Sequence, residues 1–145
     1  MKTLKQFYFE KFLSFEQEKP KPISLEERII KIIVNILNIY NGLKHLRKID
    51  QTNDDNYVYI MKSLIPVMRL LKTGVRNKTY NVIDFSGKTK EEIINILKGI
   101  AGSVNLITQT LQDLYSNQTE SKTLQIINRV SDKFSTPHIL IERLK

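Results

Sequence analysis

The chain has 145 residues, of which 41% are hydrophobic and 26% are charged, a composition typical of one folded domain with a substantial core. It contains no cysteine, which excludes disulfides and thiolate metal sites, and no apolar run of about 18 residues that would span a membrane. Its formal net charge is +8, with 23 Lys and Arg against 15 Asp and Glu, so a polyanion is a candidate partner.

The first predicted element is a short amphipathic helix over residues 3–15, because Leu4, Phe7, Tyr8, Phe12 and Phe15 follow helical spacing. The prolines of the EQEKPKP stretch then break it. The N-terminal stretch is not typical of a secretory signal, and its glutamates and lack of arginine before Arg28 argue against a transit peptide. A protein that acts in an organelle would therefore be expected to be made there.

A second helix is predicted to follow Ser24, which forms an S-x-x-E capping box with Glu27 ahead of an apolar run. Residues 29–39 are apolar nearly all round, which is typical of a central buried helix. The Asn41-Gly42 pair is the point where this helix is expected to end or kink. After the polar loop DQTNDDN, residues 57–65 are predicted to form a third helix that stops at Pro66.

The pattern changes after Pro66, and residues 66–85 are predicted to form a β-hairpin with a turn near Gly74. In its second strand, residues 79, 81, 83 and 85 alternate with residues 80, 82 and 84, as expected of an extended chain with two faces. Helix remains an alternative for residues 66–73, because leucine, methionine and lysine are good helix formers.

Two more helices are predicted near the C-terminus. The fourth covers residues 89–116, with an apolar stripe made of Ile93, Ile94, Leu97, Ile100, Val104, Ile107, Leu111 and Leu114. The fifth covers residues 121–134, with Leu124, Ile127, Val130 and Phe134 on one face, and Pro137 is expected to end it ahead of a short tail. The predicted fold is therefore mainly α, a single-domain helical bundle over residues 1–145 with one projecting basic β-hairpin.

Most of the excess positive charge lies at the centre of the chain, where residues 60–90 carry seven basic side chains against Asp84 alone, a local net charge of +6. Lysine and arginine contact phosphates, and an exposed aromatic ring can stack on a base. The predicted RNA-binding residues are Lys62, Arg69, Lys72, Arg76, Lys78 and Tyr80. A packing role for Tyr80, and a merely solvated lysine-rich surface, are the alternatives.

Enzymatic signals are weak. The acidic pairs such as Glu26-Glu27 are adjacent in sequence and do not face each other on a helix, and His45 and His138 have no metal-binding spacing. Gly87-Lys88-Thr89 matches the end of a P-loop, but Val82 stands where that motif needs its first glycine. The sequence therefore predicts no catalytic residue, no metal ligand and no cofactor.

The central stretch resembles the bacterial-type small-subunit ribosomal protein seven family. In that family a helix ends in A-[IL]-x-N-V-x-P, and a basic strand, a V-G-G turn and a T-Y-Q-V-P strand follow. Here residues 60–66 read I-M-K-S-L-I-P and residues 79–83 read T-Y-N-V-I, and the distance from Pro66 to Tyr80 matches without a gap. Further on, TLQIINRVSD is similar to the family's K-L-A-x-E-[IL]-x-D helix, and the positions of Ile94, Ile96 and Ile100 match apolar positions of the family.

The chain also departs from the family. Thr73-Gly74 stands at the family's double arginine, and Arg76-Asn77 at its glycine pair. The basic N-terminal arm is nearly missing and the C-terminal helix is shortened. Before residue 60 two registers are open. In one, Asn35 and Gly42-Leu43-Lys44 are similar to the family's N-x-x-M-x-D-G-K-K, but too few residues then remain before Pro66 for the family's second helix. In the other, which preserves the number of helices, residues 27–30 are similar to the A-E-[KR]-I-V of the second helix.

The resemblance implies a structural component of the small ribosomal subunit, without catalysis, that binds ribosomal RNA in the subunit head. It implies a role in assembly, with neighbouring ribosomal proteins and the exit-site tRNA and mRNA path as partners. The bias towards lysine, isoleucine and asparagine suits a mitochondrial, organelle-encoded member, or a cytoplasmic one in a bacterial-type host. The alternatives are a helical protein-interaction or scaffold module with a solvated basic loop and, third, an enzyme whose pocket the sequence does not reveal.

Overall fold

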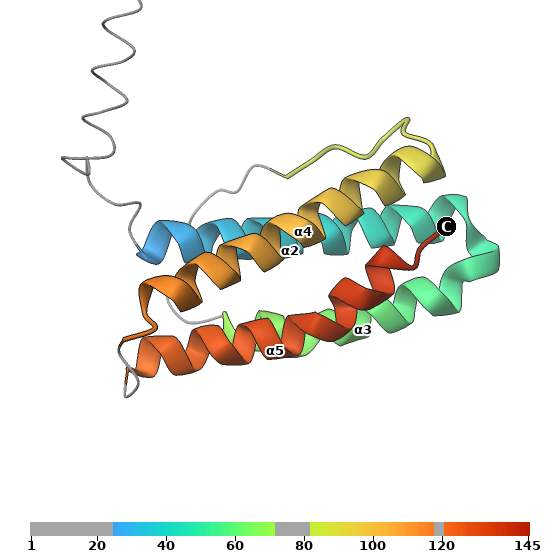
Figure 1. Ribbon diagram of the computed structural model, residues 1–145. Helices are drawn as coiled ribbons and strands as arrows, with labels where there is room; N and C mark the ends of the chain where they lie inside the picture. The colour runs from blue at the N-terminus through green and yellow to red at the C-terminus, as the bar shows by residue number, and fades with distance from the viewer. Residues whose placement is uncertain (1–24, 72–81, 118–120) are drawn as a thin grey trace, which may run out of the picture.

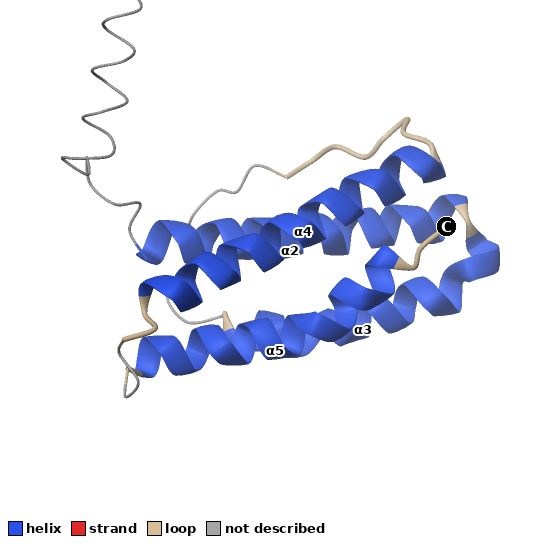
Figure 2. Cartoon of the chain, viewed as in Figure 1, coloured by secondary structure: helices blue, strands red, loops and turns tan. Residues whose placement is uncertain are grey.

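The computed structural model describes residues 25–71, 82–117 and 121–145. They form four long helices: α2 (Leu25–Ile49), α3 (Asp54–Leu70), α4 (Lys90–Leu114) and α5 (Lys122–Glu142), with a short 3-10 helix, η1 (Gln51–Asn53), between α2 and α3 (Figures 1 and 2). The prediction of a mainly helical fold is confirmed. The predicted helix over residues 3–15 and the Ser24 cap lie outside the described residues.

The four helices form a bundle in which each helix packs against two others. α2 and α5 each contact α3 and α4, so α3 and α4 lie on a diagonal of the bundle (Figure 1). An ion pair joins Lys90, the first residue of α4, to Asp50, which follows α2. α4 therefore begins at the end of the bundle where α2 ends and α3 begins, and every helix runs antiparallel to both of its neighbours.

The core is made of aliphatic side chains from all four helices, because each helix carries an apolar stripe with a period near 3.6 residues. Most of the stripe predicted for α4 is buried, as are Ile127, Val130 and Phe134 of α5. Leu114, at the end of the predicted stripe of α4, is instead 59% exposed. The periodicity therefore identified most of the inward faces of α4 and α5, although Leu124, predicted on the inward face of the fifth helix, is only half-buried.

The start of α4 is held by a reciprocal cap. The Thr89 hydroxyl accepts a hydrogen bond from the Glu92 backbone N–H at 3.2 Å, and the Glu92 carboxylate accepts one from the Thr89 N–H at 3.2 Å. These bonds hold the pKa of Glu92 below its usual range. Gly87 precedes the cap in the left-handed region, with φ of 74°. The fragment that resembles a P-loop is thus the entry to a helix.

Neither proline ends its helix, contrary to the prediction. α3 continues through Pro66 to Leu70, and α5 continues through Pro137 to Glu142 and bends in its last turns (Figure 1). Pro66 is exposed, so water can solvate the backbone carbonyl that its missing N–H leaves free. Burial of Val67 and Leu71 after Pro66, and of Ile141 after Pro137, favours continuing each helix.

The predicted β-hairpin at residues 66–85 is wrong where the structure describes it. Residues 66–70 are the last turn and a half of α3, in agreement with the helical alternative, and residues 82–85 form no strand. Lys72–Asn81 lie outside the described residues. An extended segment stabilises itself by pairing with a neighbouring strand, and the described part of the chain offers residues 82–85 only helices to pack against.

The alternation predicted for the second strand is nevertheless correct over the part that is described. Phe85 is buried and Ile83 is half-buried, whereas Val82 and Asp84 are exposed. The Ile83 backbone N–H donates to the Asn38 side-chain oxygen of α2 at 2.8 Å, and Asn38 is itself buried. The crossover segment, residues 82–89, therefore lies against the bundle as an extended chain bonded to a side chain of α2.

Gly42 does not end α2, because the helix continues to Ile49. A Cβ at Gly42 would lie 2.6 Å from Cδ2 of Leu97 in α4 and 3.2 Å from Cζ of Phe85. The glycine thus marks a close approach between α2, α4 and the crossover segment. Its lack of a side chain makes room for the side chains of two other elements.

Candidate nucleic-acid interface

Two of the predicted RNA-binding residues lie on α3. Lys62 and Arg69 are exposed, and because seven residues make almost two full turns they share one side of the helix, about 10 Å apart along its axis. The other predicted residues, Lys72, Arg76, Lys78 and Tyr80, lie outside the described residues. The structure therefore places two of the six on a common helical face that leads directly into the segment holding the rest.

A second set of basic residues lies on α5 and was missed by the sequence reasoning. Lys122, Arg129 and Lys133 are exposed at positions i, i+7 and i+11, so they form one stripe along the helix together with Ile126. The sequence did contain a signal for this stripe, because the three basic residues recur at helical spacing beside the buried residues of α5. It is easily overlooked because the three charges are spread over twelve residues.

The contacts of α5 show which neighbour this stripe faces. Ile126 lines a cavity together with Leu71, which follows α3, and α5 packs against α3. On the other flank of α5, Asn128 accepts a hydrogen bond from Gln112 of α4 at 2.9 Å. The stripe of Lys122, Arg129 and Lys133 is therefore on the side of α5 that adjoins α3. We call the exposed basic residues of these two adjacent helices, Lys62, Arg69, Lys122, Arg129 and Lys133, the α3–α5 basic face.

Two basic residues that lie outside this face are paired with carboxylates. Arg47 donates to Asp54 at 2.6 Å and Lys90 to Asp50 at 2.9 Å, so their charges are compensated. Within residues 25–71, 82–117 and 121–145, no member of the α3–α5 basic face forms an ion pair. Asp55 and Asp132 are exposed on the same helices and reduce the net charge, but neither is bonded to these cations.

The most strongly perturbed titratable groups lie at the turn between α2 and α3. The Asp50 carboxylate accepts hydrogen bonds from Tyr57 Oη at 2.5 Å, Asn53 Nδ2 at 2.8 Å and Thr52 Oγ1 at 2.9 Å, in addition to the Lys90 ion pair. These donors, Tyr57 foremost, hold the pKa of Asp50 well below its usual range. Burial, and then the bond to Asp50, raises the pKa of Tyr57.

This cluster joins four elements and has the character of a structural clamp. It ties the end of α2 to η1 and to the beginnings of α3 and α4, and all of its donors are directed at the one carboxylate. No group of three or more His, Asp or Glu side chains that could hold a metal ion occurs in the described parts of the chain. We therefore assign the cluster to stability.

Asp50→Asn is expected to lower stability at neutral pH and to change the response to acid. Because the folded-state pKa of Asp50 lies below its unfolded value of about 4, its ionised form stabilises the fold above that pH and the contribution is lost as the pH falls. The gap in urea midpoint between the natural protein and Asp50→Asn should therefore shrink from pH 6 to pH 2. Asp55→Asn, at an exposed carboxylate of α3 outside the cluster, is the control, and a gap independent of pH would contradict this assignment.

Comparison with known proteins identifies no relative of this chain: no family model, no curated protein and no solved structure matches it. In the described helices, none combines the length and apolar character needed to cross a membrane. The function is therefore argued from the basic face and from the resemblance carried by residues 60–85.

Proposed function

We propose that this protein is a structural component of the small ribosomal subunit that binds ribosomal RNA through the α3–α5 basic face and the basic residues Lys72, Arg76 and Lys78. The observation that carries the proposal is a set of exposed cations on α3 and α5 that pair with no acidic side chain of the described residues, next to the most basic stretch of the sequence. Uncompensated lysines and arginines on one surface are the electrostatic footprint of a phosphate backbone.

The spacing of these basic residues suits binding to the backbone of a duplex or folded RNA more than recognition of one base. The α3 side of this face spans about 10 Å between Lys62 and Arg69, and the α5 side about 16 Å between Lys122 and Lys133, at 1.5 Å per residue. Charges spread over such lengths meet several successive phosphates and carry no base-specific pattern by themselves. Recognition of a particular RNA would then depend on its shape.

The finer parts of the proposal rest on the resemblance of residues 60–85 to the ribosomal protein seven family. The first is a position in the head of the small subunit, near neighbouring ribosomal proteins and the exit-site tRNA and mRNA path. The second is a role in assembly, and the third is a mitochondrial, organelle-encoded origin. The decisive observation for them is whether the protein co-sediments with small ribosomal subunits from its source. Its consistent absence from those fractions would contradict the ribosomal assignment and leave RNA binding to be judged separately.

RNA binding itself is tested by filter binding to a structured ribosomal RNA fragment at rising salt concentration. Reversing Lys62, Arg69, Lys72, Arg76 and Lys78 to glutamate should flatten the dependence of log affinity on log salt, because each lost phosphate contact removes about 0.7–0.9 from the slope. Reversing Arg129 and Lys133 on α5 should lower the slope by about 1.4–1.8 on the same basis.

The matched control reverses two exposed lysines of α2, Lys31 and Lys48, which changes the net charge by the same amount as the α5 variant. It should retain most of the slope, because these residues lie on another helix. An unchanged slope in the five-residue variant would overturn the proposal. If the α2 and α5 variants lose equal amounts of the slope, only the net charge matters, and a specific role of the α3–α5 basic face is contradicted.

A helical protein-interaction module is the second candidate, favoured by the outer face of α4. Gly99 and Gly102 lie on this face, and no atom of the described residues lies within 4 Å of the Cβ that each lacks; Leu106 beside them is 64% exposed. Glycine inside a helix costs about 1 kcal/mol relative to alanine, and the packing within the bundle does not explain it here. This candidate predicts no salt-dependent RNA affinity, so the same filter-binding titration separates the two.

A further inference from the structure

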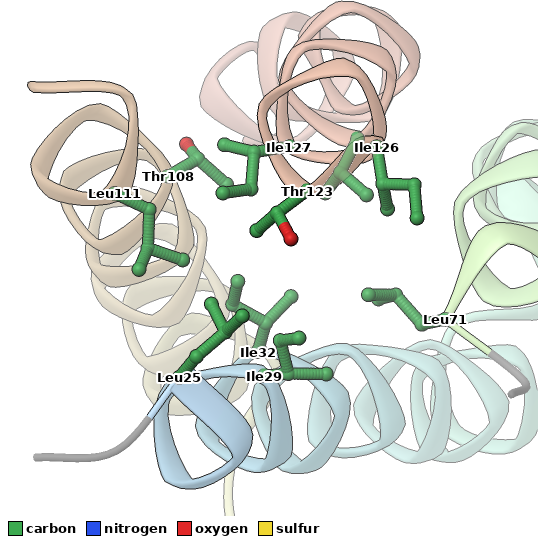
Figure 3. A pocket seen from close by; sticks show the side chains of 10 residues that line it. Leu25, Ile29, Ile32, Leu71, Thr108, Leu111, Thr123, Ile126 and Ile127 are labelled. Atoms are coloured by element: carbon green, nitrogen blue, oxygen red, sulfur yellow. The ribbon is translucent and has the colours of Figure 1, made fainter. Parts of the chain in front are cut away.

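The end of the bundle away from Asp50 contains a cavity of about 80 Å³ that all four helices surround (Figure 3). Eight of its ten lining residues are aliphatic, and the other two are Thr108 and Thr123. Figure 3 shows Leu25 and Ile29 of α2, Leu111 of α4 and Ile126 of α5 directed towards the same space. Side chains of α2, α4 and α5, together with Leu71 just after α3, converge here without filling the volume between them.

The chemistry of the lining favours an apolar occupant. A bound water needs two to four polar partners, and the Thr108 hydroxyl already donates to the Asn105 carbonyl at 2.8 Å. That leaves mainly the Thr123 hydroxyl to hold water. Ile126, on the rim, is 42% exposed, so the apolar surface continues from the cavity to the outside of the bundle. A partner that brings apolar side chains would therefore bury both the cavity lining and its rim.

The sequence holds such a partner next to the cavity. Leu25, which lines the cavity, is preceded by 24 residues, and these include Phe7, Phe9, Phe12 and Phe15, four of the six phenylalanines of the chain. The stripe Leu4, Phe7, Tyr8, Phe12 and Phe15 has helical spacing, and such a face needs an apolar surface to cover it. Residues 16–24 can reach up to about 30 Å when extended, which is enough to return the stripe to the bundle end.

We propose that residues 3–15 pack as an amphipathic helix across this end of the bundle, with Phe12 and Phe15, the stripe residues nearest to Leu25, entering the cavity. The occupant is thus a segment of the chain itself. The cavity, its aliphatic rim and the aromatic residues just ahead of it together carry this inference, which is independent of RNA binding. The fifth helix would complete the core at the end where the four described helices leave it open.

The test uses tryptophan fluorescence of the full-length chain, which contains no tryptophan of its own. In Phe15→Trp, the emission should lie at shorter wavelength and be protected from acrylamide quenching. Gln17→Trp, in the polar stretch that follows, is the matched control and should show exposed emission. If the two variants emit and quench alike, the proposal is overturned.

A second pair of variants links the signal to the cavity. Thr123→Phe places a ring in the cavity from α5 and should shift the emission of Phe15→Trp to longer wavelength, whereas Thr123→Val leaves the space nearly unchanged and should preserve it. Circular dichroism of each variant checks that the helices remain folded. A protected tryptophan that does not respond to Thr123→Phe in a folded protein would place residues 3–15 elsewhere and overturn the proposal.

The remaining occupant to distinguish is the same segment from a second copy of the chain. Light scattering on Phe15→Trp at two protein concentrations measures the mass of the species that carries the protected tryptophan. A monomer with protected emission at both concentrations supports docking within one chain. If the tryptophan is protected only in a species with the mass of a dimer, docking within one chain is overturned, and the segment instead docks into a second copy.

Discussion

Replacing Phe85 with alanine is expected to destabilise the protein by about 3–4 kcal/mol, the usual loss when a buried phenylalanine is truncated in a core. Phe85 is 4% exposed and its ring reaches the space above Gly42, where α2 and α4 approach each other. No other described side chain of the crossover segment is buried, so its loss also removes the main apolar anchor of residues 82–89. Urea denaturation followed by circular dichroism measures the difference.

Val82→Ala is the matched control for this prediction. Val82 belongs to the same extended segment but points outward and is 53% exposed, so its truncation should change the free energy of unfolding by no more than about 0.5 kcal/mol. If Phe85→Ala costs no more than Val82→Ala, the crossover segment is not part of the core. The alternation of buried and exposed residues in this segment would then not contribute to the free energy of unfolding.

Gly42→Ala is expected to destabilise the protein by about 1–2 kcal/mol, although alanine is the better helix former. The gain in helix propensity is about 1 kcal/mol, whereas inserting a carbon into a packed core costs about 1–3 kcal/mol. Here the new Cβ would lie 2.6 Å from the fully buried Leu97, so the core must move or α2 must shift away from α4. Urea denaturation followed by circular dichroism shows whether Gly42→Ala lowers or raises the free energy of unfolding.

Two glycines of α4 provide the control, because they offer the same change of residue without the contact. Gly99→Ala and Gly102→Ala have nothing within 4 Å of the new Cβ and should each stabilise the protein by about 0.5–1 kcal/mol. In a Phe85→Ala background, Gly42→Ala should cost less than in the natural sequence, because one of its two close contacts is removed. A Gly42→Ala variant as stable as Gly99→Ala would contradict the close approach of α2 and α4.

Local periodicity was enough to predict the helices, and local rules failed where packing opposed them. The apolar stripe of α4 has the same period as its helix, so its limits and most of its buried residues followed from the sequence. Pro66, Pro137 and Gly42 were each read as helix breakers, which is a statement about one residue and its neighbours. The buried residues beyond each of them make a continued helix the more stable choice, and these contacts come from elsewhere in the chain.

The predicted hairpin failed for a related reason. The alternation around Ile83 and Phe85 correctly indicated an extended chain with one buried face, but alternation does not say what that face meets. In the structure it meets the side chains of α2 and α4, and the Ile83 N–H is bonded to Asn38, 45 residues earlier. A hydrogen bond over such a separation leaves no local signal in the sequence.

The candidate interface was predictable in part. The density of charge in residues 60–90 drew attention to Lys62 and Arg69, and their seven-residue spacing is enough to place them on one side of a helix. Lys122, Arg129 and Lys133 carry the same spacing on α5 but no local excess of charge, since Asp132 lies among them. Only the packing of α5 against α3 places the two sets on adjacent helices.

By itself, the sequence determined the helical class of the fold, the inward faces of its helices and the concentration of positive charge at its centre. Each of these is a property of spacing along a few turns, where each residue is compared only with its near neighbours. The tertiary structure decided that α2 and α4 meet at Gly42, that an extended segment covers this contact, and that two helices with exposed basic residues pack side by side. These depend on contacts between residues distant in the chain, whose free energy exceeds the local preferences of a proline, a glycine or a strand-like stretch.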